Sequence, residues 1–262
     1  MPEGDTIHRA AARIRDSLGA DPLTAFAART SGIVQGVAPP GPGDPLVRVE
    51  ARGKHLLIRF GNDATLHTHL GMLGSWRVSP GGRAPALPHA RTGVAMATAN
   101  ANALCRSAPV VELLDDASVR RHPVLRLLGP DLCVPGVDLD EVLGRLTQTD
   151  GRTVGEVLLD QRVAAGIGNV YRSEVLWACR VDPWAPLGVL GPDTTRELYA
   201  TAARLLQANL TVRGPRRTVP EGLAVYERVG RPCRRCGTPV RVAAIGDPAR
   251  SAWWCPSCQT RR

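Results

Sequence analysis

The residues Ala164-Ala165-Gly166-Ile167-Gly168-Asn169 separate two helical patterns in the second half of the chain. Before them, Thr153-Val154-Gly155-Glu156 has the form of a capping box that opens a helix, and after them a helical pattern resumes over residues 170–179. Because two closely spaced glycines disfavour a continuous helix, this stretch predicts two helices joined by a tight turn. The backbone N–H groups of such a turn and the Asn169 side chain can bind a phosphate; a purely structural turn capped by Asn169 is the alternative.

Helical patterns continue on both sides of this pair. Residues 139–146 carry the apolar stripe Leu139, Val142, Leu143 and Leu146, and residues 193–210 fit a longer helix. Residues 130–136 contain two prolines and are typical of a linker between domains. We therefore predict a helical domain over residues 137–222.

The C-terminal part of the chain contains two matched cysteine pairs. Cys233-Arg234-Arg235-Cys236 and Cys255-Pro256-Ser257-Cys258 are separated by 18 residues, a spacing found in four-thiolate zinc sites. Redox or disulfide chemistry is the alternative, which a cytosolic chain disfavours. We predict a zinc finger over residues 223–262, with one structural Zn²⁺, because four thiolates leave no open position for a water.

The first half, residues 1–130, is predicted to be mostly β. Its leading helix has apolar residues at helical spacing from Ile7 to Leu18, with Asp5 or Thr6 as the capping residue and Gly19 at its end. Strands are predicted over residues 46–51, 56–60, 66–70, 94–99 and 110–114, and a loop over residues 78–93.

The N-terminus contains a residue pair that suits covalent catalysis. Removal of Met1 would leave Pro2 as a secondary amine with the carboxylate of Glu3 beside it. An α-amine titrates at about pH 8, roughly two units below lysine, so more of it is an unprotonated nucleophile at neutral pH. A secondary amine that condenses with an aldehyde-level carbon gives an iminium that is cationic at every pH, and Glu3 would be the adjacent proton donor. An ordinary proline beside a solvated glutamate is the alternative.

The charge distribution favours a polyanionic partner. The formal net charge is +9, and residues 211–262 contain 11 arginines and three acidic residues, a local charge of +8. Such a block favours nucleic acid first and an anionic membrane surface second. Lys54 is the single lysine among 33 basic residues, which indicates a need for a compact ammonium; chance retention is the alternative. No stretch approaches a membrane span, so we expect a cytosolic protein with no membrane partner.

Together these motifs resemble those of the formamidopyrimidine-DNA glycosylase and endonuclease VIII family of base-excision repair enzymes. The resemblance spans both halves of the chain. It rests on Pro2-Glu3-Gly4-Asp5-Thr6, Arg52-Gly53-Lys54-His55, Leu159-Asp160-Gln161 with Gly168-Asn169-Val170-Tyr171-Arg172-Ser173-Glu174, and the four-cysteine finger with Arg250.

The resemblance implies an α+β, multidomain fold with an N-terminal β-sandwich and leading helix, a helix–two-turns–helix domain and a zinc finger. It implies that Pro2 is the Schiff-base nucleophile and that Glu3 is the proton donor at the sugar. Lys54 is expected to contact a phosphate and to donate a proton, while Asn169 and Arg250 hold the phosphates of a flipped nucleotide. The further candidates for DNA contacts are Gly71, Met72, Arg126 and Arg172.

The implied activity is that of a bifunctional DNA glycosylase and abasic-site lyase. Its partner would be double-stranded DNA that contains oxidised bases or abasic sites, and it would cut the strand by β,δ-elimination. The resemblance also leads us to expect a monomer in the bacterial cytoplasm, associated with the nucleoid.

Two departures from the family pattern concern the damaged base. Members that act on 8-oxoguanine carry an Asp-Pro-Arg-Arg-Phe-Gly loop, whereas the corresponding residues here are Arg106-Ser107-Ala108-Pro109-Val110-Val111. Met72 matches a wedge position of the family, with a role in the strand core as the alternative. These features favour the endonuclease VIII branch and oxidised pyrimidines. The alternatives are an enzyme that prefers 8-oxoguanine or formamidopyrimidine, and a non-catalytic binder of damaged DNA, which would not need Pro2, Glu3 and Lys54 together.

Overall fold

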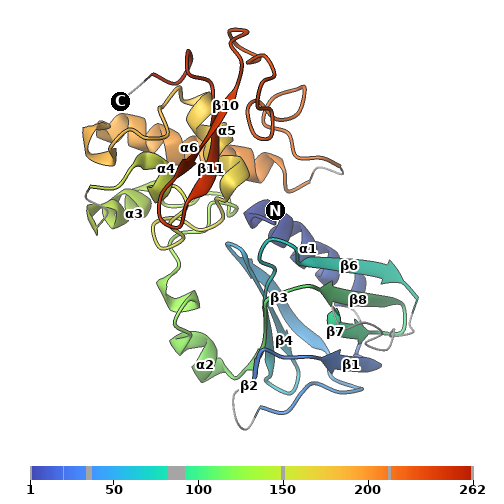
Figure 1. Ribbon diagram of the computed structural model, residues 1–262. Coiled ribbons are helices and arrows are strands. Elements are labelled where there is room, and N and C mark those ends of the chain that lie inside the picture. The colour runs from blue at the N-terminus through green and yellow to red at the C-terminus, as the bar shows by residue number, and fades with distance from the viewer. Residues whose placement is uncertain are drawn as a thin grey trace. The chain divides into compact units, whose positions relative to one another are not determined.

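The computed structural model describes residues 2–19, 21–33, 37–81, 92–148, 151–211 and 214–260. Figure 1 shows the fold and labels most of its helices and strands. The chain divides into two compact units, residues 1–127 and 128–262. Within the described ranges, no helix is long and apolar enough to cross a membrane.

The first unit is a β-sandwich that follows helix α1 (Gly4–Leu18). One sheet has five strands in the order β2-β9-β5-β4-β3, and the other has four in the order β1-β7-β8-β6. The elements after α1 are β1 (Ala25–Ala28), β2 (Gly32–Ile33), β3 (Leu46–Arg52), β4 (His55–Phe60), β5 (Thr65–His69), β6 (Ser75–Pro80), β7 (Thr92–Ala97), β8 (Ala101–Arg106), β9 (Val110–Leu114), α2 (Asp116–Arg121) and η1 (Leu125–Leu127). Residues of α1 and of both sheets, such as Ile14, Leu56 and Met96, share one core. The predicted leading helix and β-sandwich are confirmed.

Alternation along the strands decides which face of the five-stranded sheet enters this core. Leu56 in β4 and Leu66 in β5 lie in the core, so the residues next to them, His55 and His67, face the other side of the sheet. The segment after α2 covers part of this second face, because the rings of His67 and His122 have their centroids 5.0 Å apart. The second face is therefore polar but largely buried.

The start of α1 differs from the prediction. Glu3 is the N-cap residue, because its carbonyl accepts hydrogen bonds from the N–H groups of Thr6 at 2.9 Å and Ile7 at 3.2 Å. The prediction that Asp5 or Thr6 caps the helix is therefore wrong, although Gly19 is the C-cap as expected. Asp5 lies in the first turn, where a carboxylate is favoured by the helix dipole.

The predicted strands are present. In two regions, however, the strands are defined by pairing with other strands and could not be predicted from the local sequence. Strand β6 extends to Pro80 because it pairs with β8, so the first residues of the predicted loop over 78–93 are in a strand. Residues 82–91 of that loop lie outside the described residues. Strands β1, β2, β6 and β8 were not predicted. Ala25-Phe26-Ala27-Ala28, for example, has no alternating pattern and is defined by its pairing with β7.

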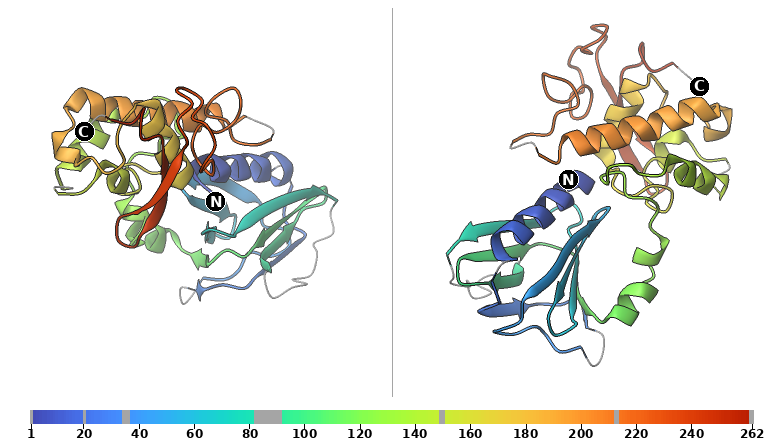
Figure 2. Two further views of the ribbon diagram at one scale, coloured as in Figure 1. Left: turned by 45° about the horizontal axis from the view of Figure 1, so that its top comes forward. Right: turned by 180° about the vertical axis from the view of Figure 1, so that it is seen from behind.

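The second unit is helical and ends in a β-hairpin. Its elements are α3 (Leu139–Gly144), η2 (Arg145–Gln148), α4 (Val154–Val157), α5 (Asn169–Ala178), η3 (Leu187–Val189), α6 (Pro192–Ala208), β10 (Arg241–Ile245) and β11 (Arg250–Trp254). The predicted capping box at Thr153 and Glu156 is confirmed, with both reciprocal bonds present. Helix α6 packs against α5 and α3, and Figure 2 shows its length from behind.

Residues 130–136 form part of this second unit instead of a linker. Leu132 and Cys133 are buried in its core, and the Leu132 N–H donates to the carbonyl of Ala165 at 3.1 Å. The prolines therefore shape an irregular, packed segment, and the division between the units falls after Leu127.

Candidate active site and nucleic-acid interface

The N-terminal pair lies where α1 begins. Pro2 is half-buried, and the side chain of Glu3 belongs to a residue that is 0% exposed. The partial positive charge of the helix N-terminus stabilises an anion at this position. The sequence placed both residues at this end of the helix, but it did not indicate that Glu3 is completely buried.

Lys54 lies in a two-residue turn. Strand β3 ends at Arg52 and β4 begins at His55, which pair with each other in the register of the two strands. Gly53 has φ +57, a conformation that favours glycine, so the sequence Gly53-Lys54 suits this hairpin turn. Lys54 is half-buried and is followed directly by a buried residue, His55.

The turn between β5 and β6 exposes two apolar side chains. Met72 is 74% exposed and Leu73 is 85% exposed, so Met72 does not belong to the strand core. Gly71 has φ +57, and a Cβ atom there would lie 2.8 Å from Cγ of Pro109. Gly71 therefore shapes the turn. Leu73 was not among the predicted residues, although two apolar residues between Gly71 and Gly74 are a signal in the sequence that indicates it.

The connection between β8 and β9 is short. Strand β8 ends at Arg106 and β9 begins at Val110, so residues 107–109 alone join them. A connection of three residues has no length for a loop that inserts side chains into DNA. The structure therefore agrees with the absence of that loop from the sequence.

The two turns between α4 and α5 are held by the amide of Gln161. Its nitrogen donates to the carbonyls of Leu159 and Ile167, both at 2.9 Å, and its oxygen accepts from the N–H of Gly166 at 3.0 Å. Gly166 has φ +113, a conformation that a side chain would strain. These bonds fix the start of α5, where Asn169 is the first residue and Gly168 is the N-cap.

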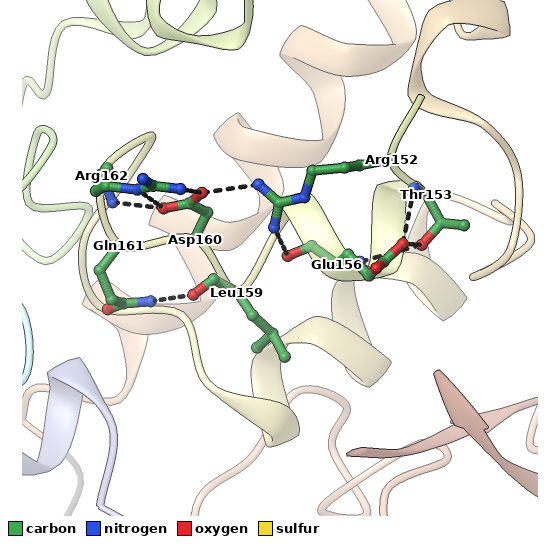
Figure 3. A network of polar contacts seen from close by, with 7 residues as sticks. All are labelled: Arg152, Thr153, Glu156, Leu159, Asp160, Gln161 and Arg162. Atoms are coloured by element: carbon green, nitrogen blue, oxygen red, sulfur yellow. Dashed lines mark hydrogen bonds and ion pairs between the residues drawn. The ribbon is translucent and has the colours of Figure 1, made fainter. Parts of the chain in front are cut away.

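An ionic network stabilises the same region, and Figure 3 shows its side chains. The carboxylate of Asp160 accepts from Arg152 at 2.8 Å and from Arg162 at 2.7 Å. The hydrogen bond from Arg162 is the main reason why the pKa of Asp160 lies well below its usual range. Arg152 also donates to the carbonyl of Glu156 at 3.3 Å, so the network ties α4 to the turn that follows it.

Asn169, Arg172 and the finger are joined by one buried guanidinium. Arg172 is 1% exposed, and its Nη2 donates to Oδ1 of Asn169 and, at 2.6 Å, to the carbonyl of Ser251. Asn169 itself is 8% exposed. Arg250 precedes Ser251 and is the first residue of β11, where it is exposed. The structure thus brings three of the predicted DNA-contact residues together, with Arg172 in the interior.

A pocket of about 480 Å³ lies beside this junction. Its guanidinium groups come from Arg152, Arg162, Arg172 and Arg250, and its carboxylates from Glu156, Asp160 and Asp247. Gly155 allows a close approach here, because a Cβ atom on it would lie 2.7 Å from Cδ1 of Ile245. The tip of the hairpin therefore packs directly on α4.

The four cysteines converge as predicted. All four sulfurs lie within 4.8 Å of one another, with Sγ to Sγ distances of 3.9 Å between Cys233 and Cys258 and 3.5 Å between Cys236 and Cys255. Tetrahedral sulfurs about 2.3 Å from a zinc ion would lie about 3.8 Å apart, so the donor set fits such an ion. The indole N–H of Trp177 in α5 donates to Cys233 at 3.3 Å and anchors the cluster to the helical part.

The remaining candidates are distributed over the first unit. Pro2, Glu3, Lys54 and Met72 all belong to it, as does Arg126, which is exposed on η1. No structural contact tests the role of Arg126, and its role in DNA binding stays a prediction.

Comparison with known proteins identifies the family. The model of the formamidopyrimidine-DNA glycosylase N-terminal domain matches residues 1–107, and the model of the formamidopyrimidine-DNA glycosylase H2TH domain matches residues 128–219. The chain is 42% identical to the probable endonuclease 8 2 of Streptomyces coelicolor, across 99% of this chain and 94% of that protein. It is 36% identical to the DNA-(apurinic or apyrimidinic site) lyase Nei2 of Mycolicibacterium smegmatis, across 99% of each protein.

The fold also matches a solved structure, a complex of Lactococcus lactis Fpg with DNA that contains an abasic site. The TM-score is 0.81 at 22% identity, across 99% of this chain and 100% of that chain. The chain therefore belongs to the formamidopyrimidine-DNA glycosylase and endonuclease VIII family.

Proposed function

We propose that this chain removes oxidised pyrimidines from duplex DNA, as a bifunctional glycosylase and abasic-site lyase, through a Schiff base at Pro2. The observation that carries the proposal is the start of α1, where Pro2 directly precedes a completely buried Glu3. Burying a carboxylate costs free energy, so its position beside a nucleophilic amine supports a chemical role. Relatives named endonuclease 8 and abasic-site lyase agree with this reaction class.

The reaction follows from a secondary amine at residue 2. Once Met1 is removed, the nitrogen of Pro2 attacks C1′ of a flipped nucleotide, the N-glycosidic bond breaks, and the base leaves with a proton. Glu3 gives a proton to the sugar as its ring opens, and an iminium forms between Pro2 and C1′. This cation acidifies the C2′ proton, whose loss expels the 3′ phosphate; a second elimination expels the 5′ phosphate. Lys54 contacts a phosphate and supplies a proton.

Two features of the first unit support the proposed preference for pyrimidines. The three-residue connection between β8 and β9 supports the absence of an inserted Arg-Phe loop. Met72 and Leu73 are exposed apolar residues on the β5–β6 turn. We propose that they fill the space that a flipped base leaves in the duplex. Gly71 gives this turn its backbone conformation.

The second unit supplies further phosphate contacts. Asn169 at the start of α5 and Arg250 at the start of β11 hold phosphates, and Arg172 positions both from the interior. The four cysteines hold one Zn²⁺, which is structural because no coordination position remains for a substrate. Arg126, in the first unit, is a further contact to the DNA backbone.

The proposed reaction on DNA also implies where the protein acts in the cell. The protein acts as a monomer on double-stranded DNA in the bacterial cytoplasm, in association with the nucleoid. The +8 charge of residues 211–262 supports binding to a polyanion.

The test is a panel of duplexes that each contain one lesion. Thymine glycol and 5-hydroxycytosine should be cut faster than 8-oxoguanine opposite cytosine, and a duplex with an abasic site measures the lyase step alone. The reverse order of rates would favour the enzyme that prefers 8-oxoguanine. Binding without cleavage of any duplex would favour the non-catalytic binder.

A further inference from the structure

The polar face of the five-stranded sheet contains a row of histidines that the proposed reaction does not use. His55 in β4, His67 in β5, Glu112 in β9 and His122 after α2 follow one another across neighbouring strands. Their contacts are 2.9 Å from Nδ1 of His55 to Nε2 of His67, 2.7 Å from Nδ1 of His67 to Oε2 of Glu112, and 3.2 Å from that oxygen to Nε2 of His122. We call these four residues the histidine chain.

The tautomer of His122 is fixed by the backbone. Its Nδ1 lies 3.2 Å from the amide nitrogens of both Val124 and Leu125. Both amides are donors, so this ring nitrogen must accept and carries no proton. The proton of a neutral His122 is therefore on Nε2, which donates to Glu112.

The direction of the remaining hydrogen bonds follows from Glu112. A carboxylate accepts only, so Nδ1 of His67 is protonated and donates to it. The Nε2 atom of a neutral His67 then accepts, which requires His55 to donate from Nδ1. This leaves the Nε2 atom of His55 as an acceptor.

Burial keeps the rings of His55 and His67 neutral. His67 is 1% exposed and His55 is 8% exposed. Burial lowers the pKa of His55 to about 3, with further effects from His69, His67, His122 and Lys54. Burial also lowers the pKa of His67 and outweighs the opposite effect of Glu112.

Charged and titratable groups lie next to the histidine chain. Lys54 precedes His55, and Arg52 lies opposite His55 on β3. His69 contacts the ring of His55 with centroids 4.7 Å apart, and burial lowers its pKa as well. Glu50, on the same edge strand, is bonded to Arg52 at 2.6 Å.

A metal ion could in principle use the same atoms. His67, Glu112 and His122 place three ligand atoms within 4.8 Å of one another. A neutral His122 that bound a metal through Nε2 would carry its proton on Nδ1, where it would meet the two backbone N–H groups. The geometry therefore favours hydrogen bonds over a metal ion.

The histidine chain ends at the turn that carries Lys54. His55 begins β4 directly after Gly53-Lys54, and its hydrogen bond and ring contacts fix this end of the turn. We propose that His67, Glu112 and His122 are positioning residues that act through His55 to hold Lys54 in place during strand cleavage. This inference rests on the proposed function of Lys54.

The first test reads the tautomers directly in the native protein. Nitrogen-15 spectra of histidine-labelled protein at pH 7 should show His55 and His67 as neutral rings with the proton on Nδ1, and His122 as a neutral ring with the proton on Nε2. A charged His67, or a proton on Nε2 of His55, would overturn the proposal. Two zinc ions per chain, one of them lost in Glu112→Gln, would overturn it in favour of a metal site.

The second test uses a matched pair of variants. The amide of His67→Gln reaches the position of Nε2 and can still accept from His55, whereas the shorter amide of His67→Asn reaches only the position of Nδ1. Single-turnover cleavage of an abasic-site duplex should fall by about 10-fold or more in His67→Asn and clearly less in His67→Gln, because small displacements of a catalytic group are costly. Equal rates for the two variants would contradict a positioning role.

Borohydride trapping separates this inference from the proposed function. Wild type and both variants should form the covalent complex at Pro2, because the histidine chain acts on Lys54 and not on the amine. Failure of the wild type to trap would refute the proposed function, whereas normal trapping with equal cleavage by both variants would refute only the inference.

Discussion

At the scale of single residues, Arg172 has an unusual environment for a predicted DNA contact. Its guanidinium is 1% exposed and joins the side chain of Asn169 to the carbonyl of Ser251, which lies 79 positions after Arg172. No sequence pattern predicts the contact with Ser251, because Arg172 lies in α5 and Ser251 lies in β11. The residue type suits the position, since a guanidinium has several donors in one plane.

The first prediction concerns the stability that this contact supplies. Arg172→Met should lower the free energy of unfolding by about 2–4 kcal/mol, because the buried Asn169 side chain and the Ser251 carbonyl lose a charged donor. Arg162→Met is the matched control, since the Arg162 side chain is 68% exposed and its loss should cost about 1 kcal/mol or less. Urea unfolding of both variants measures the difference. Equal stabilities would mean that Arg172 does not hold this junction together.

A second prediction separates Arg250 from its neighbours. Arg250→Ala should leave zinc content and folding unchanged, since the side chain is exposed, while lesion cleavage falls by about 10- to 100-fold because one phosphate is no longer held in place. Arg241→Ala is the control, as Arg241 is exposed on the partner strand of the same hairpin. Normal turnover by Arg250→Ala would reduce Arg250 to one of many surface charges.

At the scale of elements, the helices and strands that could be predicted are those with a strong pattern in their own sequence. The capping box of Thr153, the alternation along β3 and the apolar run of β4 were sufficient, because local energetics and burial agree there. Strands β1 and β6 lacked such signals and depend on pairing with β7 and β8. The histidine chain was also missed, since His67 and Glu112 meet only when β5 and β9 pair in register.

The turn between β5 and β6 gives the third prediction. Met72→Ala combined with Leu73→Ala should leave stability nearly unchanged, because both side chains are mostly exposed. Excision of thymine glycol from a duplex should slow by about 10-fold or more, since the flipped state loses the apolar groups that fill the space. Cleavage of an abasic site in single-stranded DNA serves as the control and should stay near normal. A loss of both activities would indicate a role other than filling the duplex.

At the scale of the whole molecule, all the histidines lie before residue 128, and this gives the fourth prediction. Burial lowers the pKa of His55 to about 3, and those of His67 and His69 are also lowered. Below their unfolded value of about 6.5, the unfolded chain binds more protons, so the first unit loses stability as pH falls. His55 alone should cost about 2 kcal/mol between pH 7 and pH 5.

Hydrogen exchange can measure this effect in each unit separately. After correction for intrinsic exchange rates, core amides of β4 and β5 should lose protection between pH 7 and pH 5, while those of α6 should not. The lowered pKa of Asp160 affects stability only below its unfolded value of about 3.8, outside this window. Constant protection in β4 and β5 would show that these histidines are not buried as neutral rings.

The central claim is covalent catalysis by Pro2, and borohydride trapping on a duplex with an abasic site tests it most directly. Wild type should form a crosslink that mass spectrometry places at residue 2. A variant whose N-terminal Met1 cannot be removed should not trap, because its proline nitrogen is part of a peptide bond, while Glu3→Gln should still trap, since its amine is intact. Trapping at the full rate by the variant that retains Met1, or a crosslink at Lys54, would contradict the account.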